Sequence, residues 1–367
     1  MQITLKREEL LGPLGVVVGV VERRQTLPIL ANVMLQPERN AGLTIAATDL
    51  ELEVVTKVKV EKASGDAVTV NARKLLDICR AVPEATQITL DQDGEKVKVK
   101  AGKSRFSLLT LPAADFPRVD TAEWLETVEI SEGTLRALLE ATQFSMAQQD
   151  VRYYLNGLLL EFAGKSLRAV ATDGHRMAIA SAELAATVKN ERQIIVPRKG
   201  VIELIRSLTP SDGPATLRVG TNHMQVSCGD TILTAKLVDG RFPDYTKVIP
   251  SNQTKLVRIQ CDELRAGLTR VAILSNEKYR GVRLSLSDDT LRMSAHNPEQ
   301  EEAQEELAID YKGDSLDIGF NVNYLIDAIN ALKEGDVEIG LSDPNSSCTL
   351  SAAGSDNPQY IVMPMRL

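Results

Sequence analysis

The run Asp-Gly-His-Arg at residues 173–176 has the side chains best suited to acid–base chemistry. Asp173 and His175 stand two residues apart, so on a strand their side chains would share a face. One hypothesis is therefore a hydrolase in which this pair moves protons. No Ser or Cys stands in a recognisable nucleophile motif, and His223 and His296 lack the spacing of metal ligands. The competing interpretation is a polar turn at the edge of a groove.

Two Gly-Lys-Ser triplets, at residues 102–104 and 164–166, resemble the end of a phosphate-binding loop. That loop needs a further glycine five residues before the second one. Val97 and Leu159 occupy those positions, and both triplets follow strand patterns rather than opening a helix. The triplets are therefore interpreted as turns between strands.

The four cysteines are scattered and form no CxxC pair: Cys79, Cys228, Cys261 and Cys348. Such spacing indicates neither a disulfide framework nor a zinc site, which favours a cytoplasmic location. Cys79 lies on an apolar helix face, where a buried reduced thiol is expected. The residue pattern predicts no metal and no cofactor.

The elements around these residues occur three times. Ala47-Thr48-Asp49, Ala171-Thr172-Asp173 and Ala295-His296-Asn297 each follow an apolar strand pattern, at steps of 124 residues. Repetition at a fixed period is the signature of a chain built from copies of one unit. A scaffold or a ring is therefore favoured over an enzyme with a single pocket.

Each copy combines two helical patterns with several alternating strands. The first helices are predicted at residues 7–23, 132–148 and 262–274, and the second helices begin near residues 73, 198 and 323. Strands separated from helices indicate an α+β fold with helices on one face of antiparallel sheets. We expect three repeated domains, at residues 1–120, 128–246 and 247–367.

The composition is that of an ordinary globular protein of 367 residues, with 43% hydrophobic and 25% charged residues. The apolar stretch at residues 10–21 is too short to span a bilayer and reads as a core-facing helix, so no membrane partner is expected. A net charge of −8 argues against tight electrostatic binding of nucleic acid, although a locally basic face remains compatible with it.

Opposite charges gather in the first and third repeats. Residues 299–306 form an acidic run in the third repeat only, whereas the first repeat is rich in basic residues. If both lie on outer edges, one chain can dock on another head to tail, a heterologous contact that gives rings or fibres. The basic candidates are Lys74, Lys96, Lys98, Lys100, Lys103 and Arg105.

Basic residues also gather on or beside the expected helices. A basic surface formed by these helices would suit loose, sequence-independent contact with phosphates. The alternative is an ordinary solvated helix face. These residues include Arg7, Arg73, Arg136, Arg198 and Arg265.

Several longer motifs resemble the bacterial replicative sliding clamps, the β subunits of DNA polymerase III. The most specific are Gln-Asp-Val-Arg-Tyr-Tyr-Leu-Asn-Gly at residues 149–157 and Ala-Thr-Asp-Gly-His-Arg at residues 171–176. The others lie at residues 26–30, 239–245 and 274–278 and at the closing Met-Pro-Met-Arg-Leu. The matching motifs span the whole chain.

The resemblance implies a DNA clamp fold in which a head-to-tail homodimer forms a ring of six domains around duplex DNA, bound without regard to sequence. It also implies no catalysis. The other implied partners are a clamp loader, which would supply the ATP chemistry, the catalytic subunit of the replicative polymerase, and repair and translesion polymerases.

The resemblance assigns three sets of residues. The DNA contacts are Arg24, Arg73, Gln149, Tyr153 and Tyr154. The groove for partner peptides is formed by Arg152, Leu155, Thr172, Gly174, His175, Arg176, Met177, Pro243, Val248, Asn321, Tyr324, Met363, Pro364, Met365 and Arg366. The dimer interface uses Lys74, Phe106, Ile273, Leu274, Glu299, Glu301, Glu302 and Glu305.

The chain departs from the family pattern at a few of these places. Lys247, Tyr279 and Asn345 change the rim of the implied groove, and Gln304 replaces an acid in the implied interface. A third class of protein, a three-domain adaptor that binds peptides without encircling DNA, is separated from the clamp only by dimer mass and DNA topology.

Overall fold

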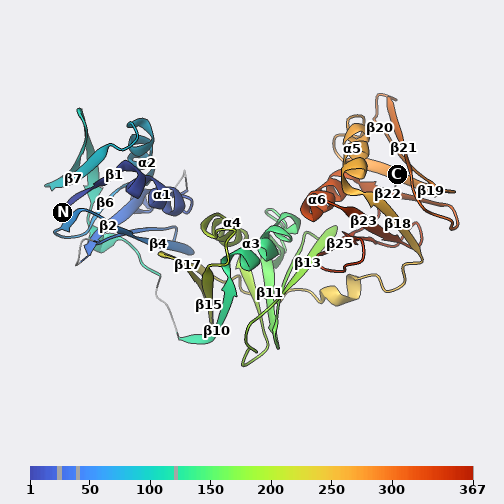
Figure 1. Ribbon diagram of the computed structural model, residues 1–367, viewed down its shortest axis with the longest axis horizontal. Helices are drawn as coiled ribbons and strands as arrows, with labels where there is room; N and C mark the ends of the chain where they lie inside the picture. Colours follow the sequence, from blue (N-terminus) through green and yellow to red (C-terminus); the bar gives the residue numbers. More distant parts are fainter. Residues whose placement is uncertain (23–26, 39–41, 120–122, 367) are drawn as a thin grey trace. The chain divides into compact units, whose positions relative to one another are not determined.

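The computed structural model describes residues 1–22, 27–38, 42–119 and 123–366 (Figure 1). By its internal contacts the chain divides into two compact units. The first comprises Met1–Arg136, Leu184–Asn190 and Lys199–Leu237, and the second Ala137–Glu183, Glu191–Arg198 and Val238–Leu367.

The described residues contain two α-helices for each sequence repeat, as predicted. They are α1 (Arg7–Val18), α2 (Ala72–Ala81), α3 (Glu132–Glu140), α4 (Arg198–Ser207), α5 (Cys261–Ala272) and α6 (Val322–Leu332). Five 3-10 turns accompany them: η1 (Pro28–Ala31), η2 (Ala113–Asp115), η3 (Gln143–Ser145), η4 (Tyr153–Asn156) and η5 (Tyr245–Val248).

The first helix of each repeat is shorter than predicted. These helices end at Val18, Glu140 and Ala272 instead of at the predicted residues 23, 148 and 274. Residue 23 itself lies outside the described part. Val20 and Val21 stay buried, but their backbone N–H groups donate to residues three positions back, the pattern of a tighter turn. Apolar periodicity therefore continued past the point where the α-helix ends.

The first unit holds one antiparallel sheet of 13 strands among the described residues. Its order is β10 (Trp124–Ser131), β15 (Pro214–Gly220), β16 (His223–Cys228), β17 (Thr231–Lys236), β4 (Leu52–Lys59), β3 (Gly42–Thr48), β2 (Asn32–Glu38), β6 (Val68–Asn71), β9 (Ser104–Leu111), β8 (Lys96–Ala101), β7 (Gln87–Asp93), β1 (Gln2–Lys6) and β5 (Lys62–Ser64).

The second unit holds two sheets. The larger has the order β14 (Arg192–Pro197), β11 (Gly157–Ala163), β12 (Ser166–Thr172), β13 (Arg176–Glu183), β25 (Gln359–Val362), β24 (Cys348–Ala352), β23 (Asp336–Leu341) and β18 (Lys255–Gln260). The smaller has the order β21 (Glu302–Ala308), β20 (Thr290–His296), β19 (Gly281–Ser287) and β22 (Leu316–Asn321).

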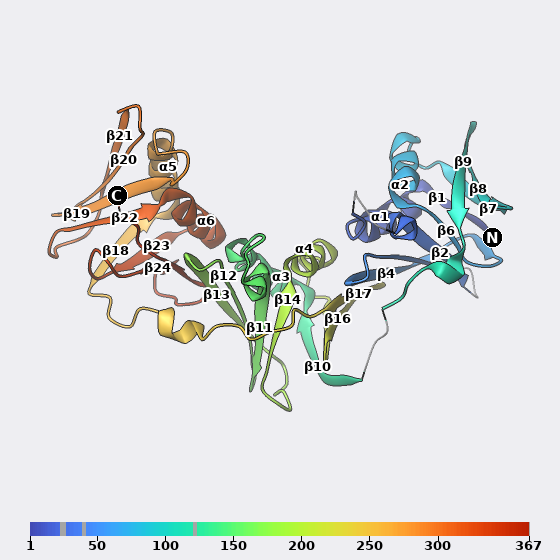
Figure 2. The same cartoon turned by 180° about the vertical axis from the view of Figure 1, so that it is seen from behind.

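Helices cover these sheets pairwise within each unit. In the first unit α1 packs on α2 and on β3 and β4, through buried Leu10, Leu14 and Val17 (Figures 1 and 2). In the second unit α5 packs on α6 and on β20 and β21, around a core that includes Leu264, Leu268 and Ile329. The predicted α+β class is therefore confirmed, with two helices in each of the three repeats and antiparallel sheets among the described residues.

The repeated turn motif folds in the same way in the first two repeats. Asp49 Oδ1 accepts from the N–H groups of Glu51 and Leu52, and Asp173 Oδ1 accepts from those of His175 and Arg176. In each case the residue after the aspartate has a left-handed backbone, with φ of 80° at Leu50 and 88° at Gly174. The preceding threonine hydroxyl accepts from that residue's N–H at 3.1 Å in both turns.

Both Gly-Lys-Ser triplets are hairpin turns, as predicted. Gly102 and Gly164 have φ near 58° and begin two-residue loops, β8 to β9 and β11 to β12. Asp93-Gly94 in the sequence is also typical of a hairpin turn, and the structure has such a turn between β7 and β8, with Gly94 and Glu95 as its loop residues. Neither triplet opens a helix, so neither forms a phosphate-binding loop.

In the sequence, apolar residues alternate with mostly charged or polar ones at positions 50–60, which predicts a half-buried strand, and this prediction is only partly right. Glu53 on β4 is 5% exposed, because Arg118 covers that face and donates to its carboxylate at 2.5 Å. Burial raises the pKa of Glu53, although Arg118 opposes the shift. A strand with charged alternate residues can thus be covered on both faces when a partner comes from elsewhere in the chain.

All four cysteine thiols are free and buried. Burial raises the pKa of Cys79 and of Cys348 to about 12, and that of Cys228 to about 11. A thiol that is both protonated and inaccessible is a poor nucleophile. We therefore predict no reaction of the native protein with a disulfide thiol reagent at mildly alkaline pH, and reaction of all four thiols after unfolding. A fast-reacting thiol in the native protein would contradict this placement.

Candidate functional site

The polar turn of the second repeat is tied to Arg152. The Arg152 guanidinium donates to the carboxylate of Asp150 at 2.8 and 3.0 Å and to the backbone carbonyl of Asp173 at 3.2 Å. These bonds lower the pKa of Asp150 to about 2. A Cβ at Gly174 would lie 2.9 Å from Arg152 Nη2, so the glycine leaves room for this close approach. The turn and the 149–152 segment thus form one polar rim.

Arg176 connects this turn to α6. Its guanidinium donates to Asp173 at 3.1 Å, to Asp327 at 2.5 Å and to the carbonyl of Phe144 at 2.9 Å. It also stacks on the ring of Tyr324, 4.5 Å from the centroid. Because every face of the guanidinium is occupied, Arg176 fixes the position of α6 against the turn.

An apolar cluster lies under the polar rim. It contains Leu155, Met177, Phe242, Tyr245 and Ile361, all less than 10% exposed. Pro243 follows Phe242 in the sequence, and Val248 ends the 3-10 turn that begins at Tyr245, with Val248 38% exposed. The predicted groove residues Leu155 and Met177 are therefore part of a continuous apolar floor.

The C-terminal tail forms a wall beside this floor. The N–H of Met363 donates to the carbonyl of His175 at 2.9 Å, and that of Met365 donates to Gly319 on β22 at 2.8 Å. Met363 is 36% exposed, and Pro364 is partly buried. Asn321 caps α6 and donates to the carbonyl of Tyr279 at 3.3 Å. The structure thus links the sequence-predicted groove residues of repeats two and three within one unit.

The proton-transfer hypothesis for Asp173 and His175 finds no support in this geometry. Asp173 Oδ1 accepts from the backbone N–H groups of His175 and Arg176, and Asp173 Oδ2 accepts from the Arg176 guanidinium. In the described structure the His175 ring makes no hydrogen bond to Asp173, and it is exposed. Asp173 shapes a turn here, which is the competing interpretation of this motif.

The predicted DNA contacts have mixed surroundings. Tyr153 is 56% exposed, whereas Tyr154 packs partly against the apolar floor. Gln149 has a left-handed backbone with φ of 57°. Arg73 donates to the carbonyl of Val21 at 2.7 Å, and Arg198 makes the equivalent bond to Met146 at 3.1 Å. Arg24 lies outside the described residues.

Several other basic helix residues stabilise helix ends. Arg7 donates to the carbonyl of Cys79, Arg136 to that of Leu208, and Arg265 to that of Lys333. Each carbonyl lies at or near the C-terminus of the second helix of its repeat, where a cation offsets the helix dipole. These three guanidinium groups therefore have a structural role in every repeat, which the sequence did not indicate.

The basic end of the chain presents an incomplete strand edge. β9 pairs with β8 along its length, but with β6 only at Thr110 and Leu111. Among the described residues, no strand pairs with the other edge of residues 104–109, where Phe106 is partly exposed and Leu109 is 71% exposed. An open edge with apolar side chains favours pairing with another strand.

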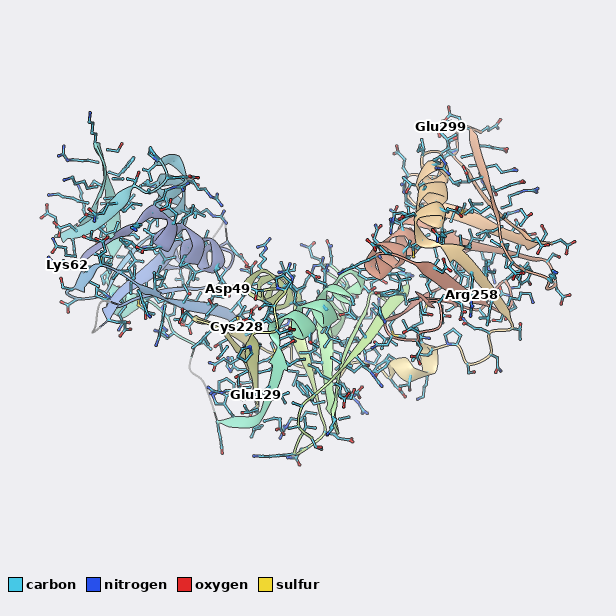
Figure 3. The ribbon with its side chains drawn as sticks, in the orientation of Figure 1. Asp49, Lys62, Glu129, Cys228, Arg258 and Glu299 are labelled. Carbon is cyan, nitrogen blue, oxygen red and sulfur yellow. The ribbon has the colours of Figure 1, made fainter. Side chains whose placement is uncertain are left out.

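The acidic end of the chain also ends in an open edge, β21. Here the sequence-predicted acids separate: Glu302 lies on one face of β21, whereas Glu305 lies on the other. Glu305 is held at 2.8 Å by Arg270 on α5. Glu299 lies at the turn before the strand (Figure 3), and Glu301 directly precedes the strand. Ile273, directly after α5, is 74% exposed, while Leu274 is partly buried.

The protein has three α+β repeats, with an open strand edge in the first repeat and another in the third. An apolar floor built from repeats two and three lies beside the C-terminal tail. These features define the polymerase-clamp class of protein. Family models for the DNA polymerase III beta subunit match the N-terminal domain at residues 1–120, the central domain at 129–244 and the C-terminal domain at 246–366. The chain therefore belongs to the DNA polymerase III β subunit family, the bacterial β sliding clamps.

Similar proteins cover the whole chain. The β sliding clamps of Pseudomonas putida and Escherichia coli K12 are each 50% identical to it over the full length of both proteins. A crystal structure of the Pseudomonas aeruginosa clamp bound to griselimycin is 49% identical, with a TM-score of 0.96 and complete coverage of both chains. The Bartonella birtlesii clamp, at 34% identity, gives a TM-score of 0.93.

The described residues contain no cluster of three or more His, Cys, Asp or Glu side chains able to hold a metal ion. No helix in this part of the chain is long and apolar enough to cross a membrane.

Sequence reasoning missed Asp150, Phe144 and Asp327 as supports of the rim. Asp150 had a local signal, because it precedes Arg152 by two residues in a turn. Asp327 had none, because it reaches Arg176 from 151 positions away. Such a contact depends on the packing of α6, which the periodic pattern alone does not locate.

The Arg176–Asp327 pair gives a direct test of this support. We predict that Asp327→Asn lowers stability by about 1–2 kcal/mol, because it weakens a charge-assisted bond to a largely buried guanidinium. The exposed pair of Asp77 and Arg80 on α2 provides the control, and Asp77→Asn should cost less than about 0.5 kcal/mol. Thermal unfolding of the two variants makes the comparison, and equal losses would contradict the assignment.

Proposed function

We propose that this chain is a DNA sliding clamp and polymerase processivity factor. Two copies close head to tail into a ring of six domains around duplex DNA. The proposed domain boundaries are residues 1–120, 128–246 and 247–367. The ring works in the bacterial cytoplasm, where it holds the replicative polymerase on its template.

One observation supports the ring: the last strand of repeats two and three pairs with a strand of the preceding repeat. β17, the last strand of repeat two, pairs with β4 of repeat one, and β25 of repeat three pairs with β13 of repeat two. The equivalent last strand of repeat one is β9, and its outer edge is open at residues 104–109. Among the described residues, no strand pairs with this edge.

The strand equivalent to β4 and β13 in repeat three is β21, which also has an open edge. Pairing β9 of one chain with β21 of another repeats the seam used twice inside the chain. The contact joins a lysine-rich region to the strand that begins at Glu302, and it can bury exposed Ile273 against apolar side chains such as Phe106. Such a heterologous contact closes when two chains form both seams.

The partner site is the apolar floor beside the C-terminal tail. A short peptide with bulky apolar residues would cover Met177 and Met363, while Arg152 and the tail backbone offer polar contacts. Methionine adapts its shape to different ligands, which suits a site shared by several polymerases and the clamp loader. The griselimycin complex of the similar Pseudomonas aeruginosa clamp supports a ligand site on this type of chain.

The proposed role needs no catalysis by the chain. A linked ring is held by topology, so weak phosphate contacts suffice and also permit sliding. A net charge of −8 agrees with weak DNA contact. The ATP chemistry of ring opening belongs to the loader.

A charge at the seam should prevent ring closure. We predict that Ile273→Asp gives monomers, because pairing would bury an aspartate without a partner. Leu256→Asp is the matched control: Leu256 is 52% exposed on the edge strand β18, away from the proposed seam, and this variant should stay dimeric. Sedimentation velocity reads the masses. A dimeric Ile273→Asp protein would place the seam elsewhere.

Removal of the tail tests the partner site separately. We predict that deleting residues 363–367 abolishes binding of a fluorescein-labelled peptide that ends in Leu-Phe, because the wall beside the floor is lost. The truncated protein should remain a dimer, since the tail lies outside the proposed seam. Fluorescence anisotropy measures the affinity, and unchanged affinity would remove the assignment of this site.

A further inference from the structure

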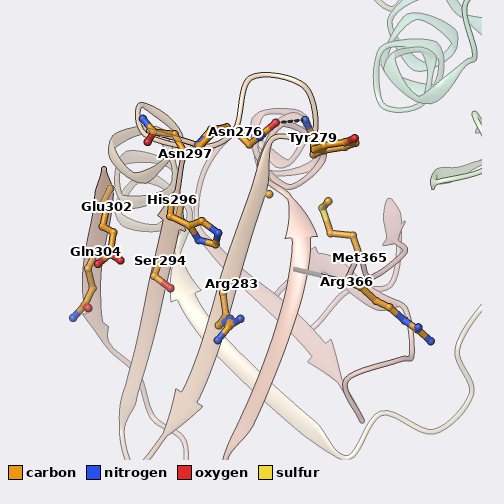
Figure 4. Close-up of a pocket in the computed structure, with 14 residues that line it drawn as sticks. Asn276, Tyr279, Arg283, Ser294, His296, Asn297, Glu302, Gln304, Met365 and Arg366 are labelled. Atoms are coloured by element: carbon orange, nitrogen blue, oxygen red, sulfur yellow. Dashed lines mark hydrogen bonds between the residues drawn. The ribbon is translucent and has the colours of Figure 1, made fainter. Parts of the chain in front are cut away.

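We infer that a second, polar cleft beside the partner site binds acidic residues that flank the apolar motif of a partner peptide. The cleft has a volume of about 650 Å³ and lies on the outward face of β19, β20 and β21 (Figure 4). This inference rests on the proposed function, because the same peptide would occupy both sites.

The register of the smaller sheet explains the chemistry of the cleft. Arg283 on β19 lies opposite Ser294 on β20, and Ser294 lies opposite Gln304 on β21. All three side chains line the cleft. This row therefore contains a cation but no carboxylate.

The next row along the same face is different. There Arg292 pairs with Glu306 at 2.8 Å, because β20 and β21 place them opposite each other. Arg283 has no such partner: among the described residues, nothing forms a hydrogen bond or an ion pair with its guanidinium. The amide of Gln304 donates to Glu306 instead.

The rest of the lining favours an anionic group over a neutral one. Figure 4 shows Arg283 between the strands and the tail, with Arg366 on the tail side and His296 above it. The one carboxylate in the lining is Glu302, in the row of His296. An unpaired guanidinium in a cleft binds carboxylates with charge-assisted hydrogen bonds, and Ser294 and Asn276 add polar contacts.

The tail joins the two sites. Met363 and Pro364 border the apolar floor, whereas Met365 and Arg366 line the cleft. Two residues of extended chain span about 7 Å. A peptide that holds its apolar residues on the floor can therefore reach the cleft with two or three more residues. This continuity favours an acidic peptide over a nucleic acid as the occupant.

The test extends the Leu-Phe probe peptide with Asp and Glu residues, at its amino end in one probe and at its carboxyl end in another. Matched probes carry Asn and Gln instead. One of the two acidic probes should bind the intact dimer about fivefold to tenfold more tightly than its neutral match. Bare and neutral probes should bind equally well to the parent protein and to Arg283→Gln.

Two substitutions should remove the gain, and one should leave it. Arg283→Gln removes the cation, and Gln304→Glu supplies a carboxylate of the chain's own to occupy it. Arg292→Gln, on the same face but already paired with Glu306, is the control and should keep the full gain. Sedimentation velocity confirms that each variant is dimeric.

The outcomes separate the two claims. If the bare probe binds but neither acidic probe gains affinity, the cleft is not an acidic-residue site, and the partner site stands. A gain that persists in Arg283→Gln comes from basic residues other than Arg283 and likewise contradicts the proposed role of the cleft. If the bare probe itself does not bind, the partner site fails and the inference falls with it.

Discussion

Backbone pairing between repeats is the constraint on which the other features of the chain depend. A strand edge with unpaired N–H and C=O groups is costly unless it is covered or solvated. Inside the chain this need is met by two equivalent seams, β17 on β4 and β25 on β13. The same rule leaves β9 and β21 open, and it makes a second copy of the chain their natural partner.

The proposed partner site lies at the second seam, and the side chains that occupy the equivalent positions of the two seams differ. At the first seam Lys199 donates to Asp49, to Glu22 and to the carbonyl of Val20, so the polar turn is closed by the chain itself. Tyr324 is the equivalent residue at the second seam. Its ring stacks on Arg176, while the tail runs along the apolar floor. At the second seam the position of the Lys199 ammonium is thus taken by an aromatic ring, and Val248 and Met363 are exposed beside it.

The repeated pattern made much of the fold predictable. Three copies of one turn motif located the strands, and the shared periodicity located α2, α4 and α6, because both signals depend only on local sequence. Helix ends were less predictable: the buried stripe continues from α1 into the turn at Val20, and periodicity cannot separate the two. The burial of Glu53 was not predictable either, because it requires Arg118 from 65 positions away.

The candidate site shows the same division. Conspicuous motifs located the rim around Arg152 and the turn at Asp173, but the supports of Arg176 come from Phe144 and Asp327, which only the folded chain brings near. The acidic run was predicted as one surface. The strand alternation divides it, because Glu305 turns towards Arg270 while Glu302 faces the cleft. The sequence predicted where the acidic residues occur, whereas the alternation of the strand determines the face to which each side chain points.

The most direct test of the ring is retention on DNA of different topology. The protein would be loaded on circular duplex DNA with its clamp loader and ATP, separated from unbound protein, and followed after a nuclease cuts the circle. We predict stable retention on the closed circle and rapid loss once the DNA is linear, because a linked ring leaves only over a free end. Equal retention on both forms would contradict the ring and indicate ordinary binding by a peptide adaptor.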